Sequence, residues 1–192
     1  MTAFVCAHGA GGHRDDRGML ALSQVLAQLS IEVVRFNFPY REAGAKRPDP
    51  MPVLKAGMRK VAEGVRGKPL LLGGRSMGGR VATMLAADGL ACDGLLLFAY
   101  PLHPAGQPEK LRDAHLAKIR VPVLCFNGTR DALCTQALMN DAVKRLTAPW
   151  TMHWLEGVDH SFHVLKSSGR SDADVLAEVG TATAKWVRSY PF

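Results

Sequence analysis

The chain has 192 residues, of which 47% are hydrophobic and 21% charged, a composition typical of a globular protein with a substantial core. This length suits one domain, so we predict a single domain over residues 1–192. No apolar stretch approaches the roughly 20 residues that cross a bilayer, and the amino terminus lacks the basic flank and apolar core of a signal peptide. We therefore expect a cytoplasmic protein without membrane association.

The net charge of +7 raises the question of nucleic-acid binding. The 24 Lys and Arg residues are spread along the chain, with no dense basic run and no aromatic residues interleaved among basic ones. Nucleic-acid-binding modules normally show such clustering. We expect no nucleic-acid partner, whereas a preference for anionic substrates remains open.

The four cysteines, Cys6, Cys92, Cys125 and Cys134, have no C-x-x-C spacing and no histidine pairs at zinc-finger distances. Cys6 and Cys125 fall inside apolar runs, where cysteine usually acts as a small buried hydrophobic residue. We predict structural thiols and no metal site.

Six short β-like runs alternate with amphipathic stretches of helical spacing. The predicted strands cover residues 3–7, 31–38, 70–73, 94–99, 121–127 and 151–155. Predicted helices follow Asp15 or Asp16, begin near Asp49-Pro50 and Thr135, and run from about Asp172. This alternation predicts an α/β fold with a mostly parallel sheet of about six strands and helices on both faces. Residues 100–120 are too few for a helical lid domain, so we expect an open site.

The pentapeptide Gly74-Arg75-Ser76-Met77-Gly78 follows an apolar run and leads into a helical pattern that includes Arg80. G-x-S-x-G at a strand-to-helix junction is typical of a nucleophile elbow, a tight turn that exposes its serine above the sheet. We expect glycine on both sides because a Cβ would collide across the turn. The pattern predicts that Ser76 is the nucleophile of a serine hydrolase.

A serine hydroxyl needs a base to take its proton and an acid to orient that base. In this architecture the partners follow in the order Ser, Asp or Glu, His. Asp131 lies in the loop after the fifth predicted strand, and His160 in the loop after the sixth. Because the carboxyl ends of parallel strands meet at one edge of a sheet, we predict a triad of Ser76, Asp131 and His160. His163 and Asp159 are the competing base and acid; Asp159 is disfavoured because a residue adjacent to the histidine seldom points at its ring.

The oxyanion hole requires two backbone N–H groups aimed at the developing negative oxygen. One is expected from Met77, the residue after the nucleophile. The other is expected from the turn His8-Gly9-Ala10-Gly11-Gly12, with Ala10 as the first choice and Gly11 as the second. The alternative for this turn is a plain glycine-rich connection.

Arg75, Tyr40 and His103 are candidate substrate contacts, because Arg75 flanks the serine and the other two lie in loops at strand ends. A structural or solvent-facing role is an equally good interpretation for each. Arg75 in particular could pair with an internal acid.

Taken together, the motifs resemble those of a known group. They are His8-Gly9-Ala10-Gly11-Gly12, Gly73-Gly74-Arg75-Ser76-Met77-Gly78-Gly79-Arg80, Tyr100-Pro101-Leu102-His103-Pro104, Gly128-Thr129-Arg130-Asp131 and Gly157-Val158-Asp159-His160-Ser161-Phe162. The set is similar to small lidless α/β-hydrolase-fold proteins related to dienelactone hydrolase, in the Tex30-like branch. The resemblance implies Ser76, Asp131 and His160 as the triad. Serine at position 76 departs from the cysteine nucleophile of dienelactone hydrolase itself and argues against dienelactone chemistry.

The prediction is a serine hydrolase of carboxylesterase or thioesterase type that cleaves a small-molecule acyl substrate through an acyl-enzyme, with no metal or organic cofactor. One alternative is a hydrolase-like protein-interaction module with little turnover, as some relatives in larger eukaryotic proteins act in protein assemblies. Another is a perhydrolase that uses the same triad. The residues leave the acyl chain length, the kind of acyl bond and the oligomeric state open.

Overall fold

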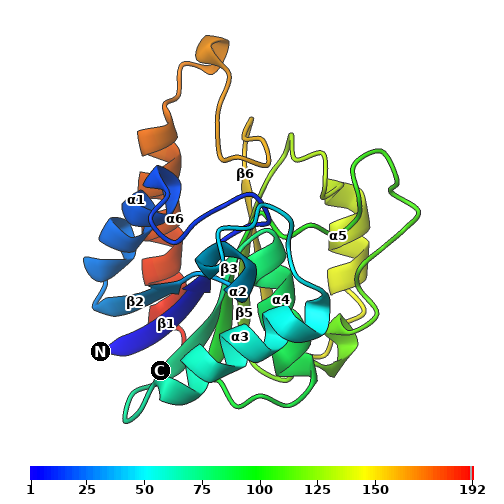
Figure 1. The fold of residues 1–192 in the computed structure, drawn as a ribbon. Coiled ribbons are helices and arrows are strands. Elements are labelled where there is room, and N and C mark those ends of the chain that lie inside the picture. Colours follow the sequence, from blue (N-terminus) through cyan, green and yellow to red (C-terminus); the bar gives the residue numbers. More distant parts are fainter. Residues whose placement is uncertain (191) are drawn as a thin grey trace.

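The centre of the fold is a six-stranded sheet in which every neighbouring pair of strands is parallel (Figure 1). The structure is a computed structural model that describes residues 1–190 and 192. The strands are β1 (Thr2–Ala7), β2 (Ile31–Phe36), β3 (Leu70–Arg75), β4 (Gly94–Phe98), β5 (Val123–Gly128) and β6 (Trp150–Leu155). Their order across the sheet is β2-β1-β3-β4-β5-β6. The predicted mostly parallel sheet of about six strands is confirmed.

Helices cover both faces of this sheet (Figure 1). One face carries α1 (Arg17–Ala27) and α6 (Asp172–Arg188), and the other carries α3 (Met51–Gly64), α4 (Met77–Ala87) and α5 (Gln136–Val143). Phe4 and Cys6 of β1 belong to the core under α1 and α6, whereas Val5 and Ala7 belong to the opposite core. Successive strand residues point to opposite faces, so a sheet covered on both sides needs apolar residues at every position. None of the described helices combines the length and apolar character required to cross a membrane.

The second strand ends earlier than the predicted range of 31–38. Phe38 has extended backbone angles and precedes a short helix, α2 (Pro39–Glu42), that the sequence pattern did not predict. Proline has no N–H for a sheet, and its fixed φ suits the first position of a helix. The consequence is that Tyr40 and Arg41 lie on a helical turn that faces the loop after β1.

The connection from β4 to β5 contains only a single turn of 3-10 helix, η1 (Leu116–Lys118). This segment therefore forms no lid domain, as predicted. The loop after β6 includes a second such turn, η2 (Lys166–Ser168), and leads to the amino end of α6 (Figure 1). Ser76, Asp131 and His160 all follow the carboxyl ends of strands, at the same edge of the sheet.

His115 connects η1 to α4, because its Nε2 lies 2.9 Å from the Thr83 hydroxyl. Burial lowers the pKa of His115 to about 4, and the positive charge of Arg80 acts in the same direction. The ordinary pKa of histidine is about 6.5. Because the folded pKa lies below the unfolded one, protonation favours the unfolded chain. The stability that this residue contributes is therefore complete above pH 6.5 and is lost as the pH falls towards 4.

We expect the free energy of unfolding of His115→Asn to depend less on pH below pH 6.5 than that of the wild type. Between pH 7 and pH 4.5 the wild type should lose about 1–2 kcal/mol more than the variant, a figure discounted for the solvent-exposed part of the ring. Urea denaturation of both proteins at the two pH values measures this difference. Equal losses in the two proteins would contradict the assignment.

Candidate active site

Ser76 occupies the turn between β3 and α4, with φ 50° and ψ −114°. Positive φ is uncommon for a residue with a side chain, and such a conformation costs about 1–3 kcal/mol that the surrounding structure must supply. Part of that support is a hydrogen bond of 2.8 Å from the Ser76 N–H to the Phe98 carbonyl at the end of β4. The predicted strand-turn-helix context is thus present.

The glycines of this turn are required by the neighbouring strand. A Cβ on Gly74 would lie 2.1 Å from the Ala7 carbonyl oxygen of β1, and a Cβ on Gly78 would lie 2.5 Å from the same atom. The expectation of a collision across the turn fits Gly79 instead, whose Cβ would lie 3.0 Å from the Gly74 carbonyl oxygen. Gly74 and Gly78 therefore allow the elbow to pack against β1.

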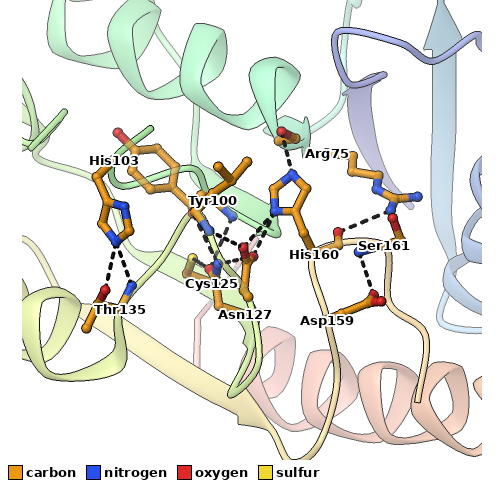
Figure 2. Close-up of polar contacts among 12 residues, drawn as sticks. Arg75, Tyr100, His103, Cys125, Asn127, Thr135, Asp159, His160 and Ser161 are labelled. Carbon is orange, nitrogen blue, oxygen red and sulfur yellow. Dashed lines mark hydrogen bonds and ion pairs between the residues drawn. The ribbon is translucent and has the colours of Figure 1, made fainter. Parts of the chain in front are cut away.

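The three predicted triad residues form one chain of hydrogen bonds. Figure 2 shows the His160 ring with dashed contacts on both of its nitrogens. His160 Nε2 lies 2.9 Å from Ser76 Oγ, and His160 Nδ1 lies 2.9 Å from each carboxylate oxygen of Asp131. With Nδ1 donating to the carboxylate, a neutral imidazole presents Nε2 as an acceptor to the serine hydroxyl.

The Asp131 side chain is completely buried, and its oxygens accept further hydrogen bonds. The Leu133 N–H donates to Oδ1 at 2.8 Å, and the Asn127 side-chain amide donates to Oδ2 at 3.2 Å. A buried carboxylate needs such donors, because an unpaired one costs several kcal/mol. These bonds fix the carboxylate in the direction of His160.

Asn127, near the end of β5, is a fully buried residue whose part in this site the sequence analysis missed. Its amide oxygen accepts from the Tyr100 N–H at 3.1 Å, and its amide nitrogen donates to the Tyr100 carbonyl at 3.1 Å as well as to Asp131 (Figure 2). The only sequence signal was a polar residue at the end of an otherwise apolar strand.

We expect Asn127→Leu to lower the free energy of unfolding by about 2–4 kcal/mol, because it leaves buried groups of Tyr100 and Asp131 without partners. Urea denaturation measures the loss. The matched control is Gln136→Leu at the exposed start of α5, which should change stability by less than about 0.5 kcal/mol. A small effect at position 127 would mean that its amide does not support the acid.

The two competing residues have other partners. Asp159 accepts hydrogen bonds from the N–H groups of Ser161 and His163, at 2.8 and 3.0 Å, and so caps its own loop. The exposed ring of His163 pairs with Asp172 at 2.6 Å. These partners set both side chains apart from the chain of bonds that contains Ser76.

The turn after β1 lies against the elbow, since a Cβ on Gly9 would be 3.5 Å from the Ser76 Cβ. Its carbonyl groups are held from the opposite side. The Tyr40 hydroxyl donates to the Ala10 carbonyl at 2.7 Å, and Arg41 donates to the carbonyls of Gly11 and Gly12 at 2.8 and 2.7 Å.

His8 completes this support from within the core. It is fully buried, its Nδ1 donates to the Gly9 carbonyl at 2.7 Å, and its Nε2 accepts from the Phe38 N–H at 3.2 Å. Burial lowers the pKa of His8, which favours the neutral ring that both bonds require. Because a peptide N–H points away from the carbonyl of the same peptide unit, fixing the carbonyls of Gly9 and Ala10 also fixes the N–H groups of Ala10 and Gly11.

The candidate substrate contacts have structural partners. Tyr40 is buried and bonded to the Ala10 carbonyl, as above. His103 is also buried: Nδ1 donates to the Pro104 carbonyl at 3.0 Å, and Nε2 accepts from the Thr135 N–H at 3.0 Å (Figure 2). Tyr40 and His103 therefore support neighbouring loops, which is the structural role that the sequence analysis gave as the alternative to substrate contact.

The Arg75 side chain reaches the loop that carries His160 (Figure 2). Its Nη2 donates to the His160 carbonyl at 3.2 Å, and its guanidinium lies 6.0 Å from the centre of the Phe162 ring. Burial lowers the pKa of Arg75, while the charge of Asp159 opposes that change. The side chain is thus directed at the loop that carries His160.

Residues 1–188 match the protein family described as the alpha/beta hydrolase domain. Solved structures with the same fold include an alpha-beta serine hydrolase homologue from Coxiella burnetii, with 20% identity, coverage of 96% of this chain and 84% of that one, and a TM-score of 0.76. A dienelactone hydrolase from Anabaena variabilis has 18% identity, coverage of 99% and 87%, and a TM-score of 0.75. A serine hydrolase without a lid from Xanthomonas campestris has 25% identity, coverage of 100% and 83%, and a TM-score of 0.74. The resemblance to lidless hydrolases related to dienelactone hydrolase is confirmed, and the chain belongs to the alpha/beta hydrolase domain family.

Proposed function

We propose that the protein is a serine hydrolase that cleaves a small ester or thioester through a covalent acyl-enzyme. The observation that carries this proposal is the unbroken chain of hydrogen bonds from Ser76 Oγ through His160 to the buried carboxylate of Asp131. An arrangement of this kind makes a serine alcohol nucleophilic at neutral pH. The open site and the family membership support the same activity.

In the first half-reaction, Ser76 Oγ attacks the acyl carbonyl carbon and its proton moves to His160 Nε2. The electron pair of the C=O bond moves to the oxygen, and Asp131 stabilises the imidazolium that forms. When the tetrahedral intermediate collapses, the bond to the leaving group breaks and His160 returns the proton to it. Water then repeats the sequence on the acyl-enzyme, with His160 as the base, and releases the acid.

The negative oxygen of both tetrahedral intermediates needs fixed donors. Met77 is the first residue of α4, so its N–H has no acceptor within the helix. The N–H of Ala10, or of Gly11 as second choice, is the other donor in this proposal. The bonds from Tyr40, Arg41 and His8 to the turn after β1 give those groups fixed orientations before substrate binds.

We expect Tyr40→Phe to lower kcat about three- to tenfold with little change in KM. The variant frees the Ala10 carbonyl and loosens a donor that acts mainly in the transition state. Steady-state hydrolysis of p-nitrophenyl acetate measures both constants, and Tyr190→Phe in the carboxyl-terminal segment is the matched control. A rise in KM alone would assign Tyr40 to substrate binding instead.

The activity is tested with p-nitrophenyl esters from acetate to decanoate and with S-acetyl-N-acetylcysteamine as a thioester. We expect turnover of the short esters, with a burst of nitrophenolate equal to the enzyme concentration if deacylation is slower than acylation. Ser76→Ala should abolish both burst and turnover, whereas Ser189→Ala should retain them. Absence of turnover for every substrate would favour an interaction module.

A further inference from the structure

Three basic side chains gather beside α4, outside the triad: Arg80, Arg112 and His115. Arg80 lies in the second turn of α4, and the other two come from the segment between β4 and η1. After burial, the charge of Arg80 is the next cause that lowers the pKa of both Arg112 and His115. The charge of Arg80 thus acts on both other groups, and His115 is held against α4 itself, with its Nε2 2.9 Å from the Thr83 hydroxyl.

The residues that the structure describes leave this cluster without a counter-ion. The Nε of Arg80 is buried and has no hydrogen-bond partner there, and neither Arg80 nor Arg112 belongs to any ion pair of the described residues. The acids whose charges reach His115 bind other cations. Asp113 pairs with Arg145 at 2.8 Å, and Asp88 pairs with Lys55. A buried donor without a partner is costly, and most such groups in folded proteins have one.

The backbone and neutral side chains around the cluster are satisfied without these guanidinium groups. The buried Tyr100 hydroxyl donates to the Arg112 carbonyl at 2.9 Å, and the buried Thr83 hydroxyl lies 2.9 Å from His115 Nε2. Arg80, Arg112 and His115 are each partly exposed to solvent. The groups that surround the cluster are thus held in place, and its guanidinium N–H donors can be reached by a molecule from solvent.

The position of the cluster relates it to the reaction. Arg80 lies one helical turn after the nucleophile, since its N–H donates to the Ser76 carbonyl at 3.1 Å. One turn rises about 5.4 Å, and helical side chains lean towards the amino end of their helix, which here is the end that carries Ser76. The backbone of Arg80 is therefore about one helical turn from Ser76, a separation that a small substrate spans.

We propose that Arg80 and Arg112, with the neutral His115 ring beside them, bind an anionic group of the substrate, a carboxylate or a phosphate. Guanidinium groups with free N–H donors are the side chains best suited to these anions. The inference rests on the proposed function and narrows it to esters or thioesters that carry a negative charge near the scissile carbonyl.

Two substrate pairs distinguish where the charge lies. Mono-p-nitrophenyl succinate against p-nitrophenyl acetate tests a carboxylate on the acyl side. S-acetylmercaptoacetate against S-acetyl-N-acetylcysteamine tests a carboxylate on the leaving group. For one pair, the wild type should prefer the anionic member by kcat/KM, and Arg80→Gln and Arg112→Gln should each reduce that preference about tenfold or more. Arg80→Lys should retain part of it, and Arg120→Gln on the nearby surface should leave it unchanged. The proposal is overturned if the wild type prefers the anionic member of neither pair. It is also overturned if both Gln variants keep the wild-type preference.

Binding is measured separately from turnover by titrating the Ser76→Ala protein with inorganic phosphate and following the His115 ring signals by NMR. We expect saturable shifts that Arg80→Gln weakens about tenfold or more. If phosphate causes no shift of the His115 signals while the wild type hydrolyses neutral esters, the anion site is overturned and the proposed function is not. If the His115 signals shift as expected while the wild type hydrolyses none of the substrates, the proposed function is overturned and the anion site is not.

Discussion

Replacing Ser76 with alanine is expected to lower kcat for p-nitrophenyl acetate by about 10⁴- to 10⁶-fold, because the remaining groups have no nucleophile to activate. The free energy of unfolding should change little, since alanine at φ 50° keeps the same backbone strain. Ser76→Gly should be equally inactive and more stable by about 1 kcal/mol, because glycine tolerates positive φ. Steady-state kinetics and urea denaturation measure the two effects.

The controls for this prediction compare single and double substitutions of the triad residues Ser76 and His160. His160→Ala should lower kcat nearly as much as Ser76→Ala, and the double variant should be no slower than either, because the two residues act as a unit. Multiplicative losses in the double variant, or more than about 1% of wild-type kcat in Ser76→Ala, would mean that another residue is the nucleophile.

Gly74→Ala is expected to prevent folding or to cost at least about 4 kcal/mol of stability. Its Cβ would lie 2.1 Å from the Ala7 carbonyl oxygen, and φ at this position is +137°, so the variant must separate β3 from β1 as well as strain the backbone. Soluble yield and the urea denaturation midpoint measure the loss.

The matched control is Gly64→Ala at the end of α3, where a Cβ meets nothing within 4 Å. That variant should be neutral or up to about 1 kcal/mol more stable, because alanine favours helix over glycine. A loss below about 1 kcal/mol in Gly74→Ala would contradict the account of the elbow.

The parts of the site that the sequence predicted depend on local patterns and on the topology of a parallel sheet. Apolar runs located the strands, and in a parallel sheet their carboxyl ends meet at one edge. Asp131 and His160 could therefore be assigned to that edge without any knowledge of their contacts. The same logic predicted that the turn after β1 would lie near Ser76.

The parts that the sequence could not predict depend on contacts between distant residues. Tyr40 and Ala10 are 30 positions apart, and His103 and Thr135 are 32 apart, so no local pattern shows that these side chains support loops. The need for Gly74 and Gly78 arises from Ala7 on another strand. The Arg80 Nε has no partner among the described residues, and this likewise depends on where the acids of other segments bind.

The most direct test of the account is to treat the folded protein with a fluorophosphonate and to identify the modified residue by peptide mass spectrometry. Such a reagent requires an activated serine, so the account predicts stoichiometric modification of Ser76 in the wild type and almost none in His160→Ala or in urea-unfolded protein. Modification of a different residue, or equal labelling of Ser76 with and without His160, would contradict it.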